Sequence, residues 1–232
     1  MLTPKIIFGL LLTSLTLEIS GQPISNYKAH SNQEFCFLQN EGQWNAAIVC
    51  KGISLHSNVY ILKDGLSFSH STKTTDDLNN ASFLVWNMKF MNTQNDYAIK
   101  IMNTNESVYS FLSGQQKENW IIHPNLCSSI LYEELYERID LKFYGNGSQL
   151  EYDYVVHPGG AIQDIASRYE GVKNLGINDE GDLEINTGWI QQIQKAPVSW
   201  QEVDGVRTWV KIEYSLLNDT TFGFIEIGRA HV

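Results

Sequence analysis

The amino-acid sequence predicts an all-β protein, built either as an antiparallel β-sandwich-like domain or as two fused β layers. Apolar and polar residues alternate with a period of two along most of the chain, which is the pattern of half-buried strands. Short turns rich in glycine, asparagine and aspartate separate these stretches. One segment, residues 128–138, has a pattern that a helix could also adopt. Regularly spaced strands with so little helix are typical of packed β-sheets.

The composition limits both the size of the fold and its partners. The chain has 232 residues, of which 43% are hydrophobic, which is enough for a buried core but for no more than two domains. Its 16 Lys and Arg residues stand against 26 Asp and Glu residues, so the net charge is −10. Because an acidic surface repels phosphates, the charge argues against nucleic acid or anionic lipid as the main partner.

The first segment, residues 1–21, is predicted to be a signal peptide. Lys5 precedes the apolar run 6–12, and small residues precede the expected cleavage site after Gly21. The alternative is a buried N-terminal helix or strand. The run is too short to span a bilayer, and no later segment is apolar enough to do so. We therefore expect residues 22–225 to form one β-rich extracellular domain, secreted or associated with the cell surface, without a transmembrane segment.

The first clear hairpin is predicted in the N-terminal third of the chain. Residues 59–62 and 66–70 alternate in polarity, and the Asp64-Gly65 pair between them is a strong signal for a tight hairpin turn. Residues 82–91 alternate in the same way and should form the next long strand.

A second hairpin is predicted at the centre of the fold. Residues 139–144 and 150–156 alternate in polarity, and the Gly-Asn-Gly sequence between them accepts the positive φ angles of a turn. The residues expected to face the core are Leu141, Phe143, Tyr152 and Tyr154.

Further strands are expected toward the C-terminus, each bounded by glycine, asparagine or aspartate. They cover residues 165–169, 175–177, 182–186, 188–193, 209–216 and 221–225. Earlier in the chain, the polar segments 73–80 and 92–96 are expected to be loops that are too short to be domain linkers, which favours one domain.

Three cysteines, Cys36, Cys50 and Cys127, would meet an oxidising compartment on export. Because three is an odd number, at most one internal disulfide can form, and Cys36–Cys50 would close a short loop. The alternatives are small buried side chains or a reactive thiol.

Three carboxylates form the candidate metal site. Glu151 and Asp153 lie two residues apart on one predicted strand and therefore share a face, and Asp140 can join them from the neighbouring strand. Such a cluster could hold Ca²⁺, act as a glycosidase pair, or simply be a solvated strand face. We expect no cofactor beyond this calcium candidate. Because no nucleophile elbow, phosphate loop or dinucleotide fingerprint occurs, we expect no enzymatic activity.

The chain is rich in aromatic residues, which could serve either the core or a binding surface. Exposed indole rings could stack on sugars, whereas buried ones would pack a β domain. The six tryptophans are Trp44, Trp86, Trp120, Trp189, Trp200 and Trp209. Surface glycans or proteins are therefore candidate partners.

A series of short motifs in a fixed order covers nearly all of the chain after the leader. The strongest are LYERIDLKFYG at residues 135–145 and LEYDYVVHPG at residues 150–159. The weaker ones are FLQNEGQW at 37–44, VYILKDGL at 59–66, YSFLSG at 109–114 with Trp120, GDL at 181–183 and APVSWQ at 196–201. The order of the motifs, rather than any one of them, makes the pattern specific.

In this order the motifs resemble the uncharacterised N-terminal domain of large secreted bacterial surface proteins. In that family the domain precedes SBBP-type propeller repeats, PKD-like modules or a gliding-motility-type C-terminal sorting module. The chain departs from the family pattern at Glu137 and Arg138, where Pro-Gly is usual, at Gly160, where Ala is usual, and at Trp200, where Tyr is commoner. The resemblance implies downstream modules of the same chain as partners.

Residues 226–232 are predicted to be a non-native tail. They break the strand pattern, and a common sequencing-adapter stretch can encode them. The natural reading frame would then continue beyond Ile225.

These observations together predict a function without catalysis. We expect a structural or adhesive N-terminal module of a larger secreted or cell-surface bacterial protein, of the gliding or adhesion type. The alternative is a carbohydrate-binding module that serves a downstream enzyme.

Overall fold

The computed structural model describes residues 5–12, 35–53, 58–71, 83–106, 110–111, 121–122, 124–203 and 205–227. These residues form strands and one short 3₁₀ turn, η2 (Ile162–Asp164), with no α-helix among them. Their strand pairings are antiparallel, as the ladders of the two central hairpins illustrate. The prediction of an all-β protein is confirmed.

The strands follow one another with short connections. In chain order they are β1 (Lys5–Leu12), β2 (Cys36–Gln39), β3 (Ile48–Ile53), β4 (Asn58–Leu62), β5 (Gly65–Ser71), β6 (Phe83–Met91), β7 (Ala98–Glu106), β8 (Ser110–Phe111), β9 (Ile121–Ile122), β10 (Asn125–Tyr136), β11 (Ile139–Asn146), β12 (Gln149–Val156), β13 (Ala166–Glu170), β14 (Asn174–Ile177), β15 (Leu183–Asn186), β16 (Gln191–Gln194), β17 (Val198–Val203), β18 (Val206–Trp209), β19 (Lys211–Asn218) and β20 (Thr221–Ile227).

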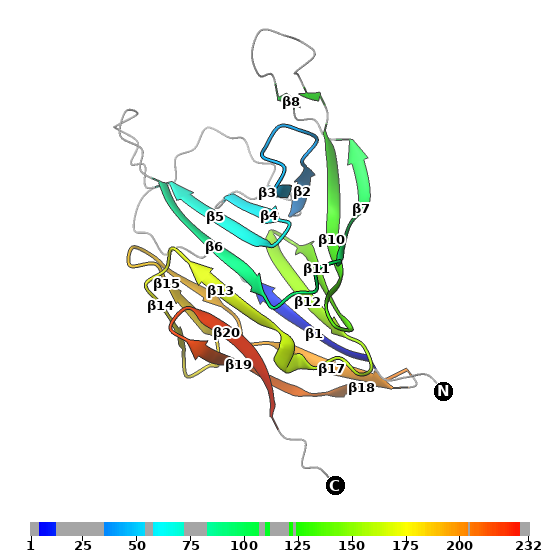
Figure 1. Cartoon of the computed structure of the whole chain (residues 1–232), viewed down its shortest axis with the longest axis vertical. Helices are drawn as coiled ribbons and strands as arrows, with labels where there is room; N and C mark the ends of the chain where they lie inside the picture. The colour runs from blue at the N-terminus through cyan, green and yellow to red at the C-terminus, as the bar shows by residue number, and fades with distance from the viewer. Residues whose placement is uncertain are drawn as a thin grey trace.

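Most of these strands belong to one long sheet. Its order is β18-β17-β1-β12-β11-β10-β2-β3-β4-β5-β6-β13-β20-β19, and β7 is a third partner of β10, beside β11 and β2 (Figure 1). A three-stranded sheet, β14-β15-β16, and the small pair β8-β9 are separate from it.

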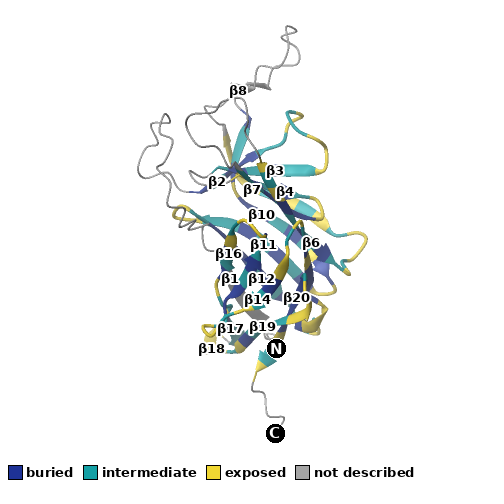
Figure 2. Ribbon diagram, turned by 90° about the vertical axis from the view of Figure 1, so that its left-hand side faces the viewer, coloured by how far each residue is buried: buried dark blue, intermediate teal, exposed yellow. Residues whose placement is uncertain are grey.

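The long sheet bends so that its two halves face each other across an aromatic core. The ring of Tyr154 on β12 lies 5.8 Å from that of Phe224 on β20. The ring of Phe90 on β6 lies 6.4 Å from that of Phe143 on β11. Strands that are distant in the sheet order therefore pack face to face, as in a β-sandwich. Figure 2 shows the buried residues gathered in the strands and the exposed residues at the turns.

The hairpin formed by β11 and β12 lies at the centre of this core, as predicted. Its register pairs Leu141 with Tyr154 and Phe143 with Tyr152, and all four side chains are buried. Because side chains alternate across a strand, the charged neighbours between them face the opposite side of the sheet. The predicted facing is confirmed.

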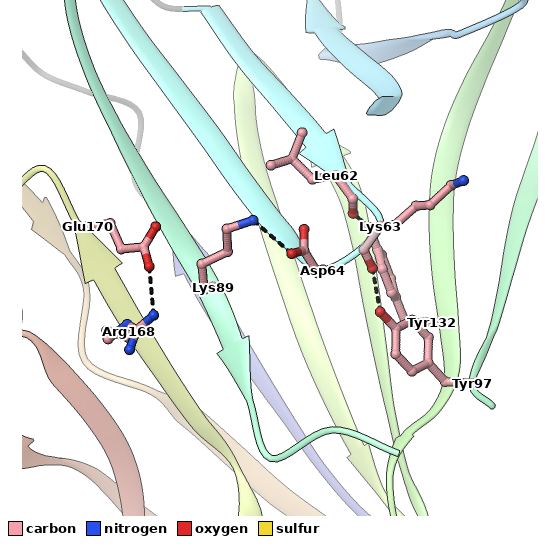
Figure 3. A network of polar contacts seen from close by, with 8 residues as sticks. All are labelled: Leu62, Lys63, Asp64, Lys89, Tyr97, Tyr132, Arg168 and Glu170. Atoms are coloured by element: carbon pink, nitrogen blue, oxygen red, sulfur yellow. Dashed lines mark hydrogen bonds and ion pairs between the residues drawn. The ribbon is translucent and has the colours of Figure 1, made fainter. Parts of the chain in front are cut away.

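The hairpin formed by β4 and β5 also has the predicted turn, and three side chains hold that turn in place, one from β6, one from β10 and one from the residue before β7 (Figure 3). The Nζ of Lys89 lies 2.7 Å from the Oδ2 of Asp64. The hydroxyl of Tyr97 donates to the carbonyl of Lys63, and that of Tyr132 donates to the carbonyl of Leu62. Gly65 is required here, because a Cβ at this position would lie 2.0 Å from a backbone oxygen of β6.

Residues 128–138 belong mostly to strand β10, so the helical alternative is wrong. A β-bulge between Tyr132 and Tyr136 adds two extra residues to β10 relative to β11, and Glu134 there has a positive φ of 53°. Tyr132 and Tyr136 on either side of the bulge are buried, and Leu135 inside the bulge is buried as well. That spacing imitates the apolar stripe of a helix.

Residues 5–12 form β1, which lies inside the long sheet between β12 and β17. The segment considered above as a signal peptide, or alternatively as a buried helix or strand, is thus a strand in the structure. Cleavage after Gly21 stays a prediction, and residues 13–34 lie outside the described residues.

The last strand is longer than predicted. Strand β20 continues to Ile227, two residues beyond the predicted strand at 221–225, and residues 228–232 lie outside the described part, so the predicted end of the domain at Ile225 stays a prediction. Within the described residues, no helix has the length and apolar character needed to cross a membrane.

Candidate functional site

A groove opens beside the ribbon formed by β17 and β18. Its walls come from the turn at residues 179–181, from residues 196–199, and from the junction of β18 and β19 at residues 209–213. Its volume is about 550 Å³, which is within the usual range for small-ligand sites. The groove is therefore the candidate functional site.

An exposed indole ring forms one side of this groove. Trp209 pairs in register with Trp200 across β17 and β18, and 76% of its surface is exposed. The two rings meet edge to face at 6.2 Å, and the guanidinium of Arg207 lies 5.2 Å from the centroid of the Trp200 ring. These contacts fix the orientation of the indole and leave its surface open to a ligand.

Four charged side chains also line the groove. Asp179, Glu180 and Glu213 supply carboxylates, and Lys211 forms an ion pair with Glu213 at 2.5 Å. Carboxylate oxygens accept hydrogen bonds from hydroxyl groups, and an indole face packs against the C–H groups of a ring. The groove thus combines the two kinds of contact that a sugar can make.

Asp182 fastens two walls of the groove to each other. Its Oδ2 lies 2.7 Å from the Nζ of Lys195, and its Oδ1 accepts a hydrogen bond from the amide of Ala196 at 2.8 Å. Burial alone would raise the pKa of this carboxyl, but the hydrogen bonds from Lys195 and Ala196 outweigh it, so the pKa lies below its ordinary value.

The lowered pKa makes the stability of the domain dependent on pH. A carboxyl with a lowered pKa stabilises the fold above its unfolded pKa of about 4, and this stabilisation is lost as the pH falls through the lowered folded value. We expect Asp182→Asn to be clearly less stable than the wild type in urea at pH 7, with a smaller difference at pH 3. The control is Asp179→Asn in the same turn, which is exposed and should match the wild type at both values. A difference of equal size at pH 7 and pH 3 would contradict the assignment.

The three predicted carboxylates share a sheet face but have separate partners. Asp140 lies 2.8 Å from the Nε2 of His157 and also accepts the amide of Glu134. Glu151 accepts a hydrogen bond from Asn146, and Asp153 accepts one from the hydroxyl of Tyr144. Burial raises the pKa of Asp153 above its ordinary value. Across the described residues, no group of three His, Cys, Asp or Glu side chains is arranged to hold a metal.

The calcium hypothesis for Asp140, Glu151 and Asp153 can be tested directly. A ligand that binds the folded state raises the melting temperature by mass action. Because each carboxylate already has a donor of its own, we expect the melting temperature to be the same in EDTA and in millimolar Ca²⁺. A rise with Ca²⁺ that is lost in Asp153→Asn would instead establish the site.

The tryptophans are divided between the core and the surface. Trp86 is buried, stacks on Phe68 and donates to Gln192 at 3.1 Å, whereas Trp189 and Trp209 are largely exposed. Trp44 and Trp200 are half-buried, and Trp120 lies outside the described residues. The strand predicted at residues 188–193 begins only at Gln191, which leaves Trp189 in the preceding turn. The structure therefore places one tryptophan in the core and two at the surface, and the sugar contact considered for exposed indoles stays a prediction.

The cysteines lie in or beside the core as free thiols. Cys50 and Cys127 are buried, with their Sγ atoms 3.7 Å apart, while Cys36 is half-buried. The loop-closing pair Cys36–Cys50 considered from the sequence is not bonded in the structure. Burial raises the pKa of the Cys36 thiol, and contact with Cys127 together with burial raises that of Cys50, so both favour the unreactive protonated form.

The groove was not predicted from the sequence. Its walls come from turns and from parts of β17, β18 and β19 that only the folded sheet brings together, and all four residues of the edge strand β18 are exposed. A pair of tryptophans nine residues apart, at Trp200 and Trp209, was the available signal.

Comparisons with known proteins give one match. A family described as "Domain of unknown function (DUF7948)" matches residues 37–229. No curated protein and no solved structure matches the chain. The matched residues include every wall of the groove and exclude β1.

Proposed function

Because this chain belongs to the DUF7948 family of domains of unknown function, we propose that it is a non-catalytic adhesive module of a larger secreted or cell-surface bacterial protein. The observation that carries the proposal is the largely exposed indole of Trp209 beside the groove. Exposed tryptophans anchored by neighbouring rings are common at the centre of binding surfaces. The order of motifs supports a place ahead of further surface modules in the same chain.

The ribbon of β17 and β18 is suited to contact a partner. Trp209 on β18 and Val198 on β17 are both exposed and both line the groove, so two large apolar side chains lie on the same side of the ribbon. Apolar groups gathered in this way favour association, because binding removes them from water. This arrangement supports a structural or adhesive function for the ribbon.

A carbohydrate-binding function is the second candidate, and the lining of the groove favours it. Trp209 can pack against the face of a sugar ring, while Asp179, Glu180 and Glu213 can accept its hydroxyl hydrogens. In this form the module would hold a polysaccharide for a downstream enzyme or anchor the protein to a coated surface.

A glycan array compared with immobilised extracellular proteins tests both candidates. We expect micromolar binding to one class of ligand, reduced at least tenfold by Trp209→Ala. Trp209→Ala should destabilise the fold by less than about 1.5 kcal/mol, the range of one aromatic contact. The matched control is Trp189→Ala, which removes an equally exposed indole outside the groove and should bind like the wild type.

The results separate the candidates. Glycan binding that depends on Trp209 supports the carbohydrate-binding function, and protein binding that depends on it supports adhesion to a protein surface. If both variants bind like the wild type, or if neither ligand class binds, the groove is not the binding site and the proposal is wrong.

A further inference from the structure

One interior strand of the long sheet, β1, lies outside the matched family domain. Strand β1 pairs over residues 6–12 with β12 and over residues 5–9 with β17. The family match begins at residue 37, so it contains both neighbouring strands but not β1. We call the space between β12 and β17 the strand slot.

The backbone of the slot needs a partner strand. The other edge of β12 is hydrogen-bonded to β11, and the other edge of β17 is hydrogen-bonded to β18. In the part of the chain that the structure describes, only β1 pairs with the edges that face the slot. Removal of β1 would leave two rows of unpaired N–H and C=O groups, which are strong templates for an added strand.

The strand β17 is held in place without β1, so the slot is not free to close. The amide of Val210 donates to the carbonyl of Ser199, and the hydroxyl of Ser199 donates to the carbonyl of Val210. Lys195 and Ala196, just before β17, are held as well. The carbonyl of Lys195 accepts a hydrogen bond from the hydroxyl of Tyr214 at 2.9 Å, and Asp182 binds Lys195 and Ala196. Closing the slot would move β17 by about one strand spacing, roughly 4.8 Å, against these bonds.

The character of the slot defines what can occupy it. Leu150, Tyr152, Tyr154 and Val156 on β12 are buried, so the core continues up to the edge of the slot. The present occupant, KIIFGLLL, is apolar or glycine at seven of its eight residues and antiparallel to both neighbours. An occupant therefore needs an extended apolar segment of about seven residues.

We propose that the strand slot is an acceptor site for an extended apolar segment of a partner protein, which binds antiparallel to β12 and β17 after residues 1–21 are removed. The same eight residues carry the predicted export signal and fill the slot, so export exposes the slot. The partner strand then restores the hydrogen bonds that β1 makes in the uncleaved chain.

The test uses the chain exported from a secreting host. Its mass should correspond to a start at Gln22. Hydrogen exchange should show fast amides in residues 150–156 and 198–202, slowed at least tenfold by a synthetic peptide with the sequence of residues 5–12. The control peptide carries Gly9→Pro, which removes a backbone donor at a position paired with both walls, and should give no protection. An exported chain that is unfolded alone and folds only with the first peptide supports the proposal equally.

Other results overturn the proposal. These are an exported chain that retains residues 5–12, slot amides that are protected without peptide, and equal effects of the two peptides. A stable dimer with protected slot amides would assign the slot to a second copy instead. Trp209→Ala should leave peptide binding unchanged, so failure of the slot and failure of the groove are distinguishable.

Discussion

Replacing Phe143 by alanine should lower the free energy of unfolding by about 3–5 kcal/mol. The ring is fully buried on β11 and contacts the rings of Phe90, Tyr132 and Tyr152. Truncation removes apolar surface from the core and leaves a cavity between the two halves of the sheet, which cannot collapse without moving several strands. Because a domain of this size is stable by only about 5–15 kcal/mol, the yield of folded protein should fall sharply.

Urea unfolding at pH 7 measures this effect, and Lys142→Ala is the matched control. Lys142 is the neighbouring residue on the same strand but lies on the opposite face, where its Nζ is 5.7 Å from the centroid of the Tyr144 ring. Its loss should cost less than about 1 kcal/mol. Equal losses for the two variants would contradict the facing of β11.

Replacing Gln194 by leucine should lower the free energy of unfolding by about 2–5 kcal/mol, because it leaves buried hydroxyl groups without a hydrogen-bond partner. The Nε2 of Gln194 donates to the hydroxyls of Tyr152 and Tyr214, and its Oε1 accepts from the hydroxyl of Tyr169 at 3.3 Å. Burial raises the pKa of all three tyrosines, which stay neutral and need hydrogen-bond partners. Tyr214 keeps its bond to Lys195, so the cost falls mainly on the other two.

The control for this prediction is Gln191→Leu, at the exposed start of the same strand. It makes the same chemical change without leaving a buried group unpaired, so the free energy of unfolding should change by no more than about 0.5 kcal/mol. Differential scanning calorimetry of the three proteins gives the comparison. A loss for Gln194→Leu as small as that of the control would show that the hydroxyls find other partners.

The sequence predicts the hairpins of this fold well, because their signals are local. Alternation and turn residues within about twenty positions specify both the pairing of β11 with β12 and the inward facing of Phe143. Strand β10 was harder to predict, since the bulge near Glu134 produces the spacing of a helix. The bulge forms only when β10 pairs with β11, and the sequence of β10 alone carries no information about that pairing.

The candidate site was much less predictable from the sequence. Trp209 is indistinguishable in sequence from the buried Trp86, and only the position of β18 at the sheet edge leaves it exposed. The carboxylates Asp140, Glu151 and Asp153 were placed on one face correctly, but their separate hydrogen-bond partners arise from tertiary contacts. Face membership follows from strand periodicity, whereas exposure and partners follow from the whole sheet.

The position of β1 in the sheet also has a consequence for the timing of folding. Its nearest pairing partners on β12 lie 138 residues later in the chain, at Leu12 and Leu150. Ribosomes add about 5–20 residues per second, so roughly 7–28 seconds pass before β12 exists. During that interval the ladder that places residues 5–12 inside the sheet cannot form. The export predicted for residues 1–21 would therefore be able to begin before β1 pairs with β12.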